Sequence, residues 1–271
     1  MDFLYDVLQY NYLGNAFWAA LLSGVTCGLV GTYIVSRRLV FLAGGITHAS
    51  FGGLGLAFYL GVNPIGGALC AALLSAIGIE WAGTHGRIRE DSAIGIIWSV
   101  GMALGALFMS LRPGYTSGDL TAWLFGSIIT VTNGDIRALA VLTVLLVIGA
   151  MCWLRPIMYV AFDREFARSR NLPTRTIGYL MAAVMAVAIV LSIRMMGIVL
   201  LLSLVTMPVV VANMLTRSYR MIALVAPLIA VAGNVIGLII SYEWDVPPGA
   251  AIIFTLTVVL IAVKLLTLYR K

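Results

Sequence analysis

The chain has 271 residues, of which 62% are hydrophobic and only 10% are charged, and its mean hydropathy is +1.05. Soluble domains carry about a quarter of charged residues, so this composition excludes a soluble protein and predicts an all-α, polytopic protein of the cell membrane. The net charge of +6 does not indicate nucleic-acid binding, because the basic residues form short clusters between apolar runs. We expect one transmembrane domain over residues 1–271, surrounded by lipid.

Apolar windows of span length predict about nine transmembrane helices, with eight possible if one window is false. The windows cover about residues 16–36, 40–61, 64–82, 93–111, 136–154, 176–193, 196–216, 221–241 and 249–268. The segment 118–135 is too short to span and is expected to lie in the outer interface. If the N-terminus is outside, only Arg112, Arg137 and Arg194 of the 17 basic residues lie outside. The positive-inside rule therefore predicts an outward N-terminus and an inward C-terminus.

Small residues at helical spacing predict where these spans pack closely against one another. The glycine pairs are Gly24 with Gly28, Gly101 with Gly105, and Gly233 with Gly237.

Several kinds of chemistry are missing from the sequence. No Gly-x-x-x-x-Gly-Lys-Ser/Thr loop occurs, and Lys264 and Lys271 are the only lysines, so this chain is not expected to bind ATP or to be an enzyme. All acidic residues fall in loops or at span ends in this topology, which argues against an ion-coupled secondary carrier. If ATP drives transport, a separate subunit has to bind it.

Five motifs follow one another along the chain. Residues 31–58 (GTYIVSRRLVFLAGGITHASFGGLGLAF) place two arginines before a glycine-rich span that contains His48. The acidic pair Glu90-Asp91, the segment 124–127 (LFGS), the segment 197–212 (GIVLLLSLVTMPVVVA) and the segment 245–250 (DVPPGA) follow in order. In this order they resemble the membrane subunits of ABC importers for zinc, manganese and iron.

The resemblance implies a permease that carries a divalent transition-metal ion and holds no permanent cofactor. It implies an ABC ATPase on the cytoplasmic side, an extracytoplasmic metal-binding protein, and a second permease copy, most simply as a homodimer. Permeases for ferric siderophores or vitamin B12 share the general plan, but they are usually longer by about one span. A secondary transporter is the more distant alternative.

His48 is the candidate metal contact in the transport path. Neutral imidazole suits zinc, iron and manganese, and a polar group inside a span normally faces a cavity. From the residues alone, a histidine bonded to a neighbouring carbonyl is equally expected, and the resemblance favours the transport path. Many family members carry Asp one helical turn earlier, where this chain has Gly44. Thr47, Ser50 and Asn234 are further candidate oxygen ligands of the path, although Thr and Ser in spans more often bond to their own helix.

Asp245 is the second candidate metal contact. It matches the acidic position of the family's Asp-x-Pro-x-Gly-Ala motif at the outer mouth, where a carboxylate attracts an arriving cation. A solvated turn closed by Pro247, Pro248 and Gly249 is the alternative.

The loop over about residues 155–175 is the candidate contact with the ATPase. We expect Phe162, Phe166 and Ala167 on one side of a short helix whose other residues are charged. The resemblance identifies this helix with the coupling helix of ABC importers, and a helix lying on the membrane as a basic anchor is the alternative. Asn171 replaces the usual glycine and also tolerates a left-handed cap. The candidate residues of the loop are Phe162, Asp163, Glu165, Phe166, Ala167, Asn171 and Pro173.

Overall fold

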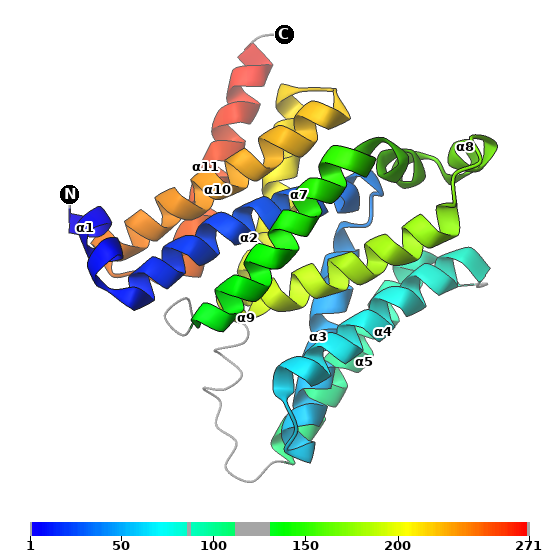
Figure 1. Ribbon diagram of the computed structural model, residues 1–271, viewed down its shortest axis with the longest axis horizontal. Helices are drawn as coiled ribbons and strands as arrows, with labels where there is room; N and C mark the ends of the chain where they lie inside the picture. Colours follow the sequence, from blue (N-terminus) through cyan, green and yellow to red (C-terminus); the bar gives the residue numbers. More distant parts are fainter. Residues whose placement is uncertain (1, 86–87, 112–130, 270–271) are drawn as a thin grey trace. The chain divides into compact units, whose positions relative to one another are not determined.

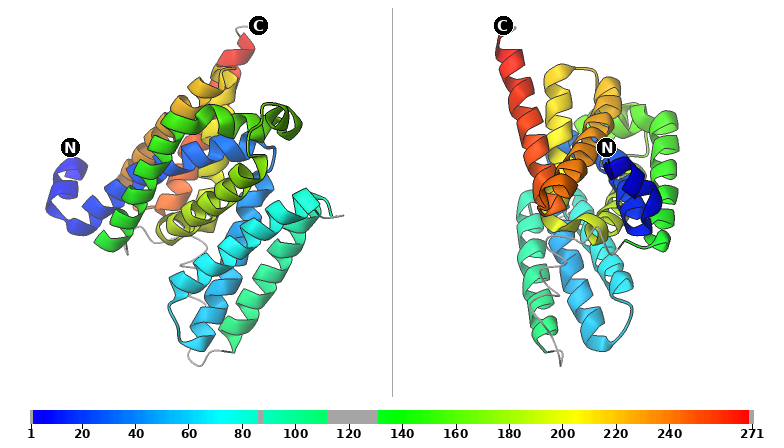
Figure 2. Two further views of the ribbon diagram at one scale, coloured as in Figure 1. Left: turned by 45° about the vertical axis from the view of Figure 1, so that its right-hand side comes forward. Right: turned by 90° about the vertical axis from the view of Figure 1, so that its left-hand side faces the viewer.

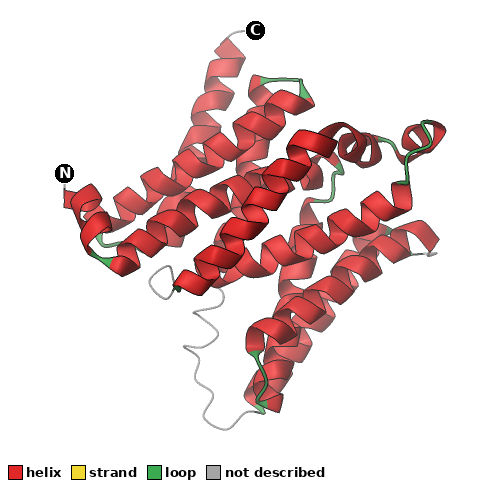
Figure 3. Cartoon of the chain, viewed as in Figure 1, coloured by secondary structure: helices red, strands yellow, loops and turns green. Residues whose placement is uncertain are grey.

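The computed structural model describes residues 2–85, 88–111 and 131–269, and these ranges are almost entirely helical (Figure 1; Figure 3). No strand occurs in them, which confirms the predicted all-α class. The helices are α1 (Asp2–Gln9), α2 (Asn11–Ser36), α3 (Val40–Leu60), α4 (Pro64–His85), α5 (Glu90–Ser110), α7 (Asn133–Phe162), α8 (Arg164–Ser169), α9 (Thr174–Leu215), α10 (Tyr219–Trp244) and α11 (Pro248–Tyr269).

Eight helices in the described ranges are long and apolar enough to cross a membrane. The nine predicted windows differ from them at α9, which contains both the 176–193 and the 196–216 window. Its 42 residues would reach about 60 Å as one straight helix, twice the thickness of the hydrocarbon core. Gly197 interrupts it with φ 75° and ψ 170°, a conformation that glycine adopts readily. The predicted outer segment 118–135 lies mostly outside the described residues.

The chain forms two compact units, each built from separated segments. Unit 1 consists of Met1–Ser36, Ala122–Met158 and Leu191–Lys271, and unit 2 of Arg37–Thr121 and Tyr159–Val190. The single transmembrane domain over 1–271 stays a prediction.

Close contact between α2, α10 and α11 organises unit 1. A Cβ atom on Gly28 would lie 2.6 Å from the Pro227 nitrogen, so only glycine allows this approach of α2 to α10. Gly24 faces α10 in the same way, and Gly233 and Gly237 face α11. The predicted small-residue contacts are therefore confirmed in this unit.

Unit 2 is organised around α3, which packs against both α4 and α5 (Figure 2). A Cβ atom on Gly101 of α5 would lie 2.6 Å from the Ala49 Cα and from the His48 carbonyl oxygen. Gly105 faces Phe51 one turn further along. These two glycines bring α5 directly against the part of α3 that carries His48.

Candidate functional site

His48 is half-buried near the middle of α3, and two side chains of α5 contact its imidazole. The ring stacks on Trp98, with centroids 4.4 Å apart and an interplanar angle of 24°. Its Nδ1 lies 2.9 Å from the Sδ of Met102. Trp98 and Met102 are four residues apart and so share one face of α5. The candidate path therefore contains a nitrogen donor beside a thioether sulfur.

Trp98 also explains why position 44 is glycine in this chain rather than the aspartate of many relatives. A Cβ atom on Gly44 would lie closest to Cζ3 of the Trp98 ring, 2.9 Å from its Cη2 and 3.2 Å from its Cε3. The indole occupies the space that an aspartate at this position would need. This chain therefore presents His48 with an aromatic face where many relatives of the resembled family present a carboxylate.

The neighbouring hydroxyl groups serve their own helix, as expected. Thr47 Oγ1 donates to the Ala43 carbonyl oxygen at 2.6 Å, and Ser50 Oγ donates to the Thr47 carbonyl oxygen at 2.6 Å. In unit 1, Asn234 Nδ2 donates to the Ala20 carbonyl oxygen of α2 at 2.8 Å. These three polar groups therefore hydrogen-bond to backbone carbonyls of α2 and α3.

Asp245 caps the C-terminus of α10. Its backbone is left-handed, with φ 51° and ψ 41°, and its N–H donates to the Ser241 carbonyl oxygen. Ser241 Oγ closes the same turn by donating to the Val246 carbonyl oxygen at 2.6 Å. The side chain of Asp245 is exposed and belongs to unit 1, whereas His48 belongs to unit 2. Among the described residues, no three His, Cys, Asp or Glu side chains are grouped as a metal site.

A buried ionic cluster joins four segments of unit 2. The Glu80 carboxylate of α4 accepts hydrogen bonds from Arg37 Nη1 at 2.8 Å and from Arg164 Nη2 at 2.6 Å. Arg37 also donates to Glu90, the first residue of α5, at 3.2 Å. The side chains of Arg37 and Glu80 are only 7% and 4% exposed. The cluster thus fixes the start of the α3 segment and α5 to the loop that contains Arg164.

Arg164 opens α8, the short helix in the candidate ATPase-contacting loop. Asp163 is its N-cap, and its Oδ1 accepts a hydrogen bond from the Phe166 N–H at 3.0 Å. Glu165 pairs with Arg168 at 2.8 Å on the exposed side. The Asp163 cap starts a helix of only six residues, Arg164–Ser169.

Asn171 ends this helix in the way its replacement of glycine predicted. Its φ is 56°, in the left-handed region. The Asn171 N–H donates to the Arg168 carbonyl oxygen at 2.9 Å, and the Leu172 N–H donates to the Ala167 carbonyl oxygen at 3.1 Å. These two bonds form a Schellman motif, and Pro173 follows it directly.

The predicted common face of Phe162, Phe166 and Ala167 is wrong. Phe162 is the last residue of α7, and Asp163 separates it from α8 with extended φ and ψ of −151° and 104°. Ala167 is fully buried, whereas Phe162 and Phe166 are 61% and 48% exposed. A helical wheel failed here because the N-cap starts a new helix in the middle of the pattern. The loop still presents two exposed aromatic rings beside charged side chains.

Sequence reasoning missed three residues that matter here: Met102, Trp98 and Glu80. The i,i+4 spacing of Trp98 and Met102 is visible in the sequence, but it does not tell which helix they face. Glu80 gave a better signal, because a carboxylate near the end of an apolar window needs a basic partner.

Comparison with known proteins places this fold. The chain matches the ABC 3 transport family over residues 9–267. The manganese transport system membrane protein MntC of Halalkalibacterium halodurans is 29% identical over 93% of this chain and 87% of its own length. MntC of Listeria innocua is 26% identical over 96% and 92%. The structure of PsaBC from Streptococcus pneumoniae in complex with Fab aligns with a TM-score of 0.85 and 25% identity, covering 97% of this chain and 94% of that chain. The family match covers nearly the whole sequence, and the chain therefore belongs to the ABC 3 transport family.

Proposed function

We propose that this chain is the membrane-spanning permease subunit of an ATP-driven importer for a divalent transition-metal ion. The observation that carries the proposal is the pairing of His48 Nδ1 with Met102 Sδ, 2.9 Å apart, within candidate spans of an ABC 3 family chain. Relatives named as manganese transport proteins support a metal cargo. The metal is the transported substrate, and no resident cofactor is required.

The source of energy lies in another subunit, because this sequence has no phosphate-binding loop. We assign the docking of an ABC ATPase to the end of α7 and to α8, where Phe162 and Phe166 respectively are exposed. Over the nine predicted windows, two of which lie in α9 on either side of Gly197, the distribution of Lys and Arg supports an outward N-terminus and an inward C-terminus, which puts α8 on the cytoplasmic side. An extracytoplasmic binding protein would deliver the metal, and a second permease copy would complete the path.

Transport requires the metal site to be weak in at least one conformation. Two protein donors, His48 and Met102, leave the remaining coordination positions of the ion to water or to groups beyond this pair, unlike a closed structural zinc site. ATP binding to the partner favours one conformation, and hydrolysis favours the other. The ionic cluster around Glu80 links Arg164 of α8 to Arg37, which precedes α3, so it connects the ATPase contact to the segment that carries His48.

The donor pair also bears on which metal is carried. Carboxylate and water oxygens suit manganese, whereas imidazole and thioether donors suit softer ions. The Trp98 ring occupies the space that a side chain at position 44 would need, so His48 Nδ1 and Met102 Sδ are the donors at this point of the candidate path. We therefore expect zinc or ferrous iron to be carried in preference to manganese.

The test is ATP-dependent uptake of zinc, manganese and iron into proteoliposomes that contain this chain, its ATPase and its binding protein, counted by elemental analysis. We expect His48→Ala to abolish uptake and Met102→Leu to lower it for the softer ions. Ser99→Ala is the matched control, because Ser99 is exposed on α5 and bonds its own helix at Gly95.

Three outcomes would contradict the proposal. Uptake by assembled His48→Ala at the parent rate would exclude His48 from the path. ATP hydrolysis without accumulation of any ion would favour the metal-chelate or vitamin alternative. Failure of any ATPase to assemble with the chain would refute the ABC mechanism for this protein.

A further inference from the structure

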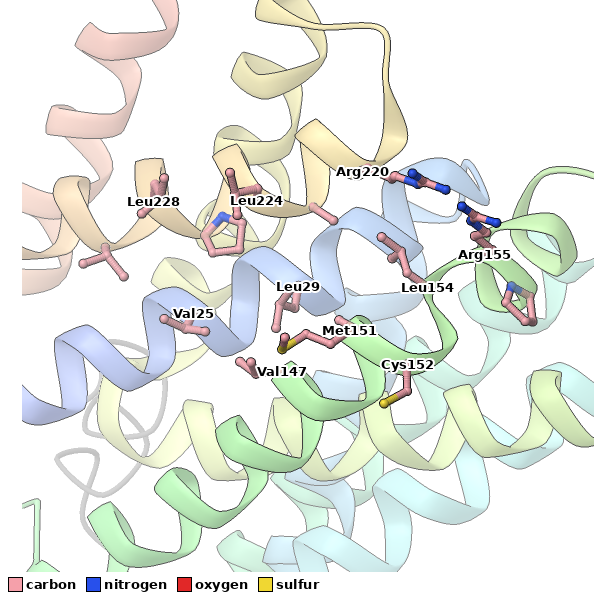
Figure 4. A pocket seen from close by; sticks show the side chains of 15 residues that line it. Val25, Leu29, Val147, Met151, Cys152, Leu154, Arg155, Arg220, Leu224 and Leu228 are labelled. Carbon is pink, nitrogen blue, oxygen red and sulfur yellow. The ribbon is translucent and has the colours of Figure 1, made fainter.

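A groove of about 780 Å³ lies in unit 1 between α2, α7 and α10 (Figure 4). Its volume is within the range of about 300–1,000 Å³ that is usual for small-molecule pockets. Val25 and Leu29 of α2, Val147 and Met151 of α7, and Leu228 of α10 are among its walls. Such walls suit a hydrocarbon chain.

Two arginines are the only charged residues among the fifteen that line the groove. Arg155 lies just beyond the break in α7 at Trp153, and Arg220 is the second residue of α10. Both guanidinium groups lie at the same end of the groove (Figure 4). The groove is therefore amphipathic, with a cationic end and an apolar body.

The cationic end has no counter-ion within the described part of unit 1. Neither Arg155 nor Arg220 forms an ion pair with a described residue. The first turn of α10 contains no acidic residue, and the N-cap Ser218 makes no side-chain capping bond, so the positive end of the helix dipole adds to the two charges. Asp135 lies at the start of α7 and Glu243 near the end of α10, at the opposite ends of these helices from the arginines. Both arginines are exposed and form no ion pair with a described residue, so an anion from outside this unit can approach them.

The length of the groove matches one leaflet of a bilayer. Arg220 and Val231 are eleven residues apart on α10, which is about 16 Å at 1.5 Å per residue. Half of a hydrocarbon core of about 30 Å is about 15 Å. With the arginines at headgroup depth, the apolar walls end near the bilayer centre.

We infer that this groove binds an anionic phospholipid, whose phosphate contacts Arg155 and Arg220 and whose acyl chain lies along α2, α7 and α10. Guanidinium groups bind phosphate in bidentate geometry, and basic pockets between transmembrane helices are typical sites for anionic headgroups. The exposed side chains of Met151, Leu224 and Leu228, which are 82%, 59% and 62% exposed in the chain, become covered by the lipid. The bound lipid bridges three helices and so stabilises the folded unit.

The test measures binding of dioleoyl phosphatidylglycerol to the full chain in detergent, by native mass spectrometry and by the thermal unfolding midpoint. Dioleoyl phosphatidylcholine and inorganic phosphate are the comparison ligands. We expect phosphatidylglycerol to bind more tightly and to raise the midpoint more than either of them. Arg155→Gln and Arg220→Gln should each weaken its binding about fivefold, the effect of one basic residue near an anionic headgroup.

Two further variants separate the head and the body of the site. Arg217→Gln is the matched control, because Arg217 lies three residues from Arg220 but does not line this groove. It should bind phosphatidylglycerol like the parent. Leu228→Trp fills the apolar body while both arginines remain, and it should reduce lipid binding without changing the midpoint in phosphatidylcholine. If an arginine variant does not fold, Leu228→Trp carries the test.

Each contrary result overturns the inference. Equal binding of both lipids, or an unchanged response in both arginine variants, would exclude recognition of the headgroup here. Full stabilisation by inorganic phosphate would indicate a soluble anion. A change in oligomeric state in Leu228→Trp, with lipid binding unchanged, would show that a second copy of the chain covers the groove. Metal uptake is not part of this test, so its outcome is independent of the proposed function.

Discussion

Glu80→Gln tests whether the ionic cluster of unit 2 stabilises the fold. The substitution keeps the shape of the side chain and removes its charge. Arg164 then loses its carboxylate partner in the cluster, while Arg37 keeps Glu90. Glu80 and Arg37 are only 4% and 7% exposed, so water compensates little for the lost charge at that pair, whereas Arg164 is 23% exposed and is partly hydrated.

The magnitude follows from the burial of the pair. Breaking a buried ion pair by removing one partner costs about 3–5 kcal/mol. The remaining pair between Arg37 and Glu90 places the expected loss near the lower end, about 3 kcal/mol. For a chain of this size that corresponds to a decrease of roughly 6–9 °C in the unfolding midpoint.

The assay is thermal unfolding in detergent, with Glu165→Gln as the matched control. Glu165 and its partner Arg168 are 82% and 51% exposed, so this variant should stay within about 1 °C of the parent. A double-mutant cycle between Glu80→Gln and Arg164→Gln should show a coupling energy of about 1 kcal/mol or more. Equal midpoints for the Glu80 and Glu165 variants, or additive free-energy changes in the cycle, would refute the conclusion that the buried cluster stabilises the fold.

Three further changes probe separate features. Asn171→Gly should leave the stability unchanged and Asn171→Ala should lower it by about 1 kcal/mol, because alanine disfavours the left-handed backbone. The measurement is the thermal unfolding midpoint of each variant. Equal midpoints for the two variants would contradict the role of Asn171 as a left-handed cap. Gly101→Ile should destabilise the fold by about 1–3 kcal/mol and lower metal uptake, because the new side chain meets the backbone at His48. Gly95→Ala should do neither, because Gly95 has open space around it. Similar losses in both variants would exclude the packing argument. Asp245→Gly keeps the left-handed cap and removes the carboxylate, so we expect unchanged folding with slower metal uptake at low metal concentration. Uptake at the parent rate would show that Asp245 only caps α10 and does not attract the metal.

Local sequence signals predicted the features that depend on one helix or one turn. Glycines spaced four apart identified the faces that pack closely, because a missing Cβ is the direct condition for that approach. Asn171 identified the end of α8, because few residues tolerate a left-handed backbone. Apolar windows found the spans, and they divided α9 near Gly197, where the helical backbone is interrupted.

Features that depend on two helices meeting could not be predicted from the sequence. Met102 lies 54 residues from His48, and nothing in the periodicity of α5 says that its sulfur meets that imidazole. The ionic cluster joins Arg37 to Glu80 and Glu80 to Arg164 across 43 and 84 residues of sequence. The helical wheel over the loop failed for a related reason, since Asp163 divides one pattern between two helices.

The contact between Gly44 and Trp98 makes these two positions dependent on one another. An aspartate introduced at position 44 alone would collide with the indole, so it is tolerated only after residue 98 has become smaller or has turned away. The reverse order is also constrained, because a tryptophan arriving at position 98 requires glycine at position 44. A lineage that exchanges a carboxylate for an aromatic surface beside His48 therefore has to change both positions, with glycine at position 44 whenever the indole holds the place that it has here.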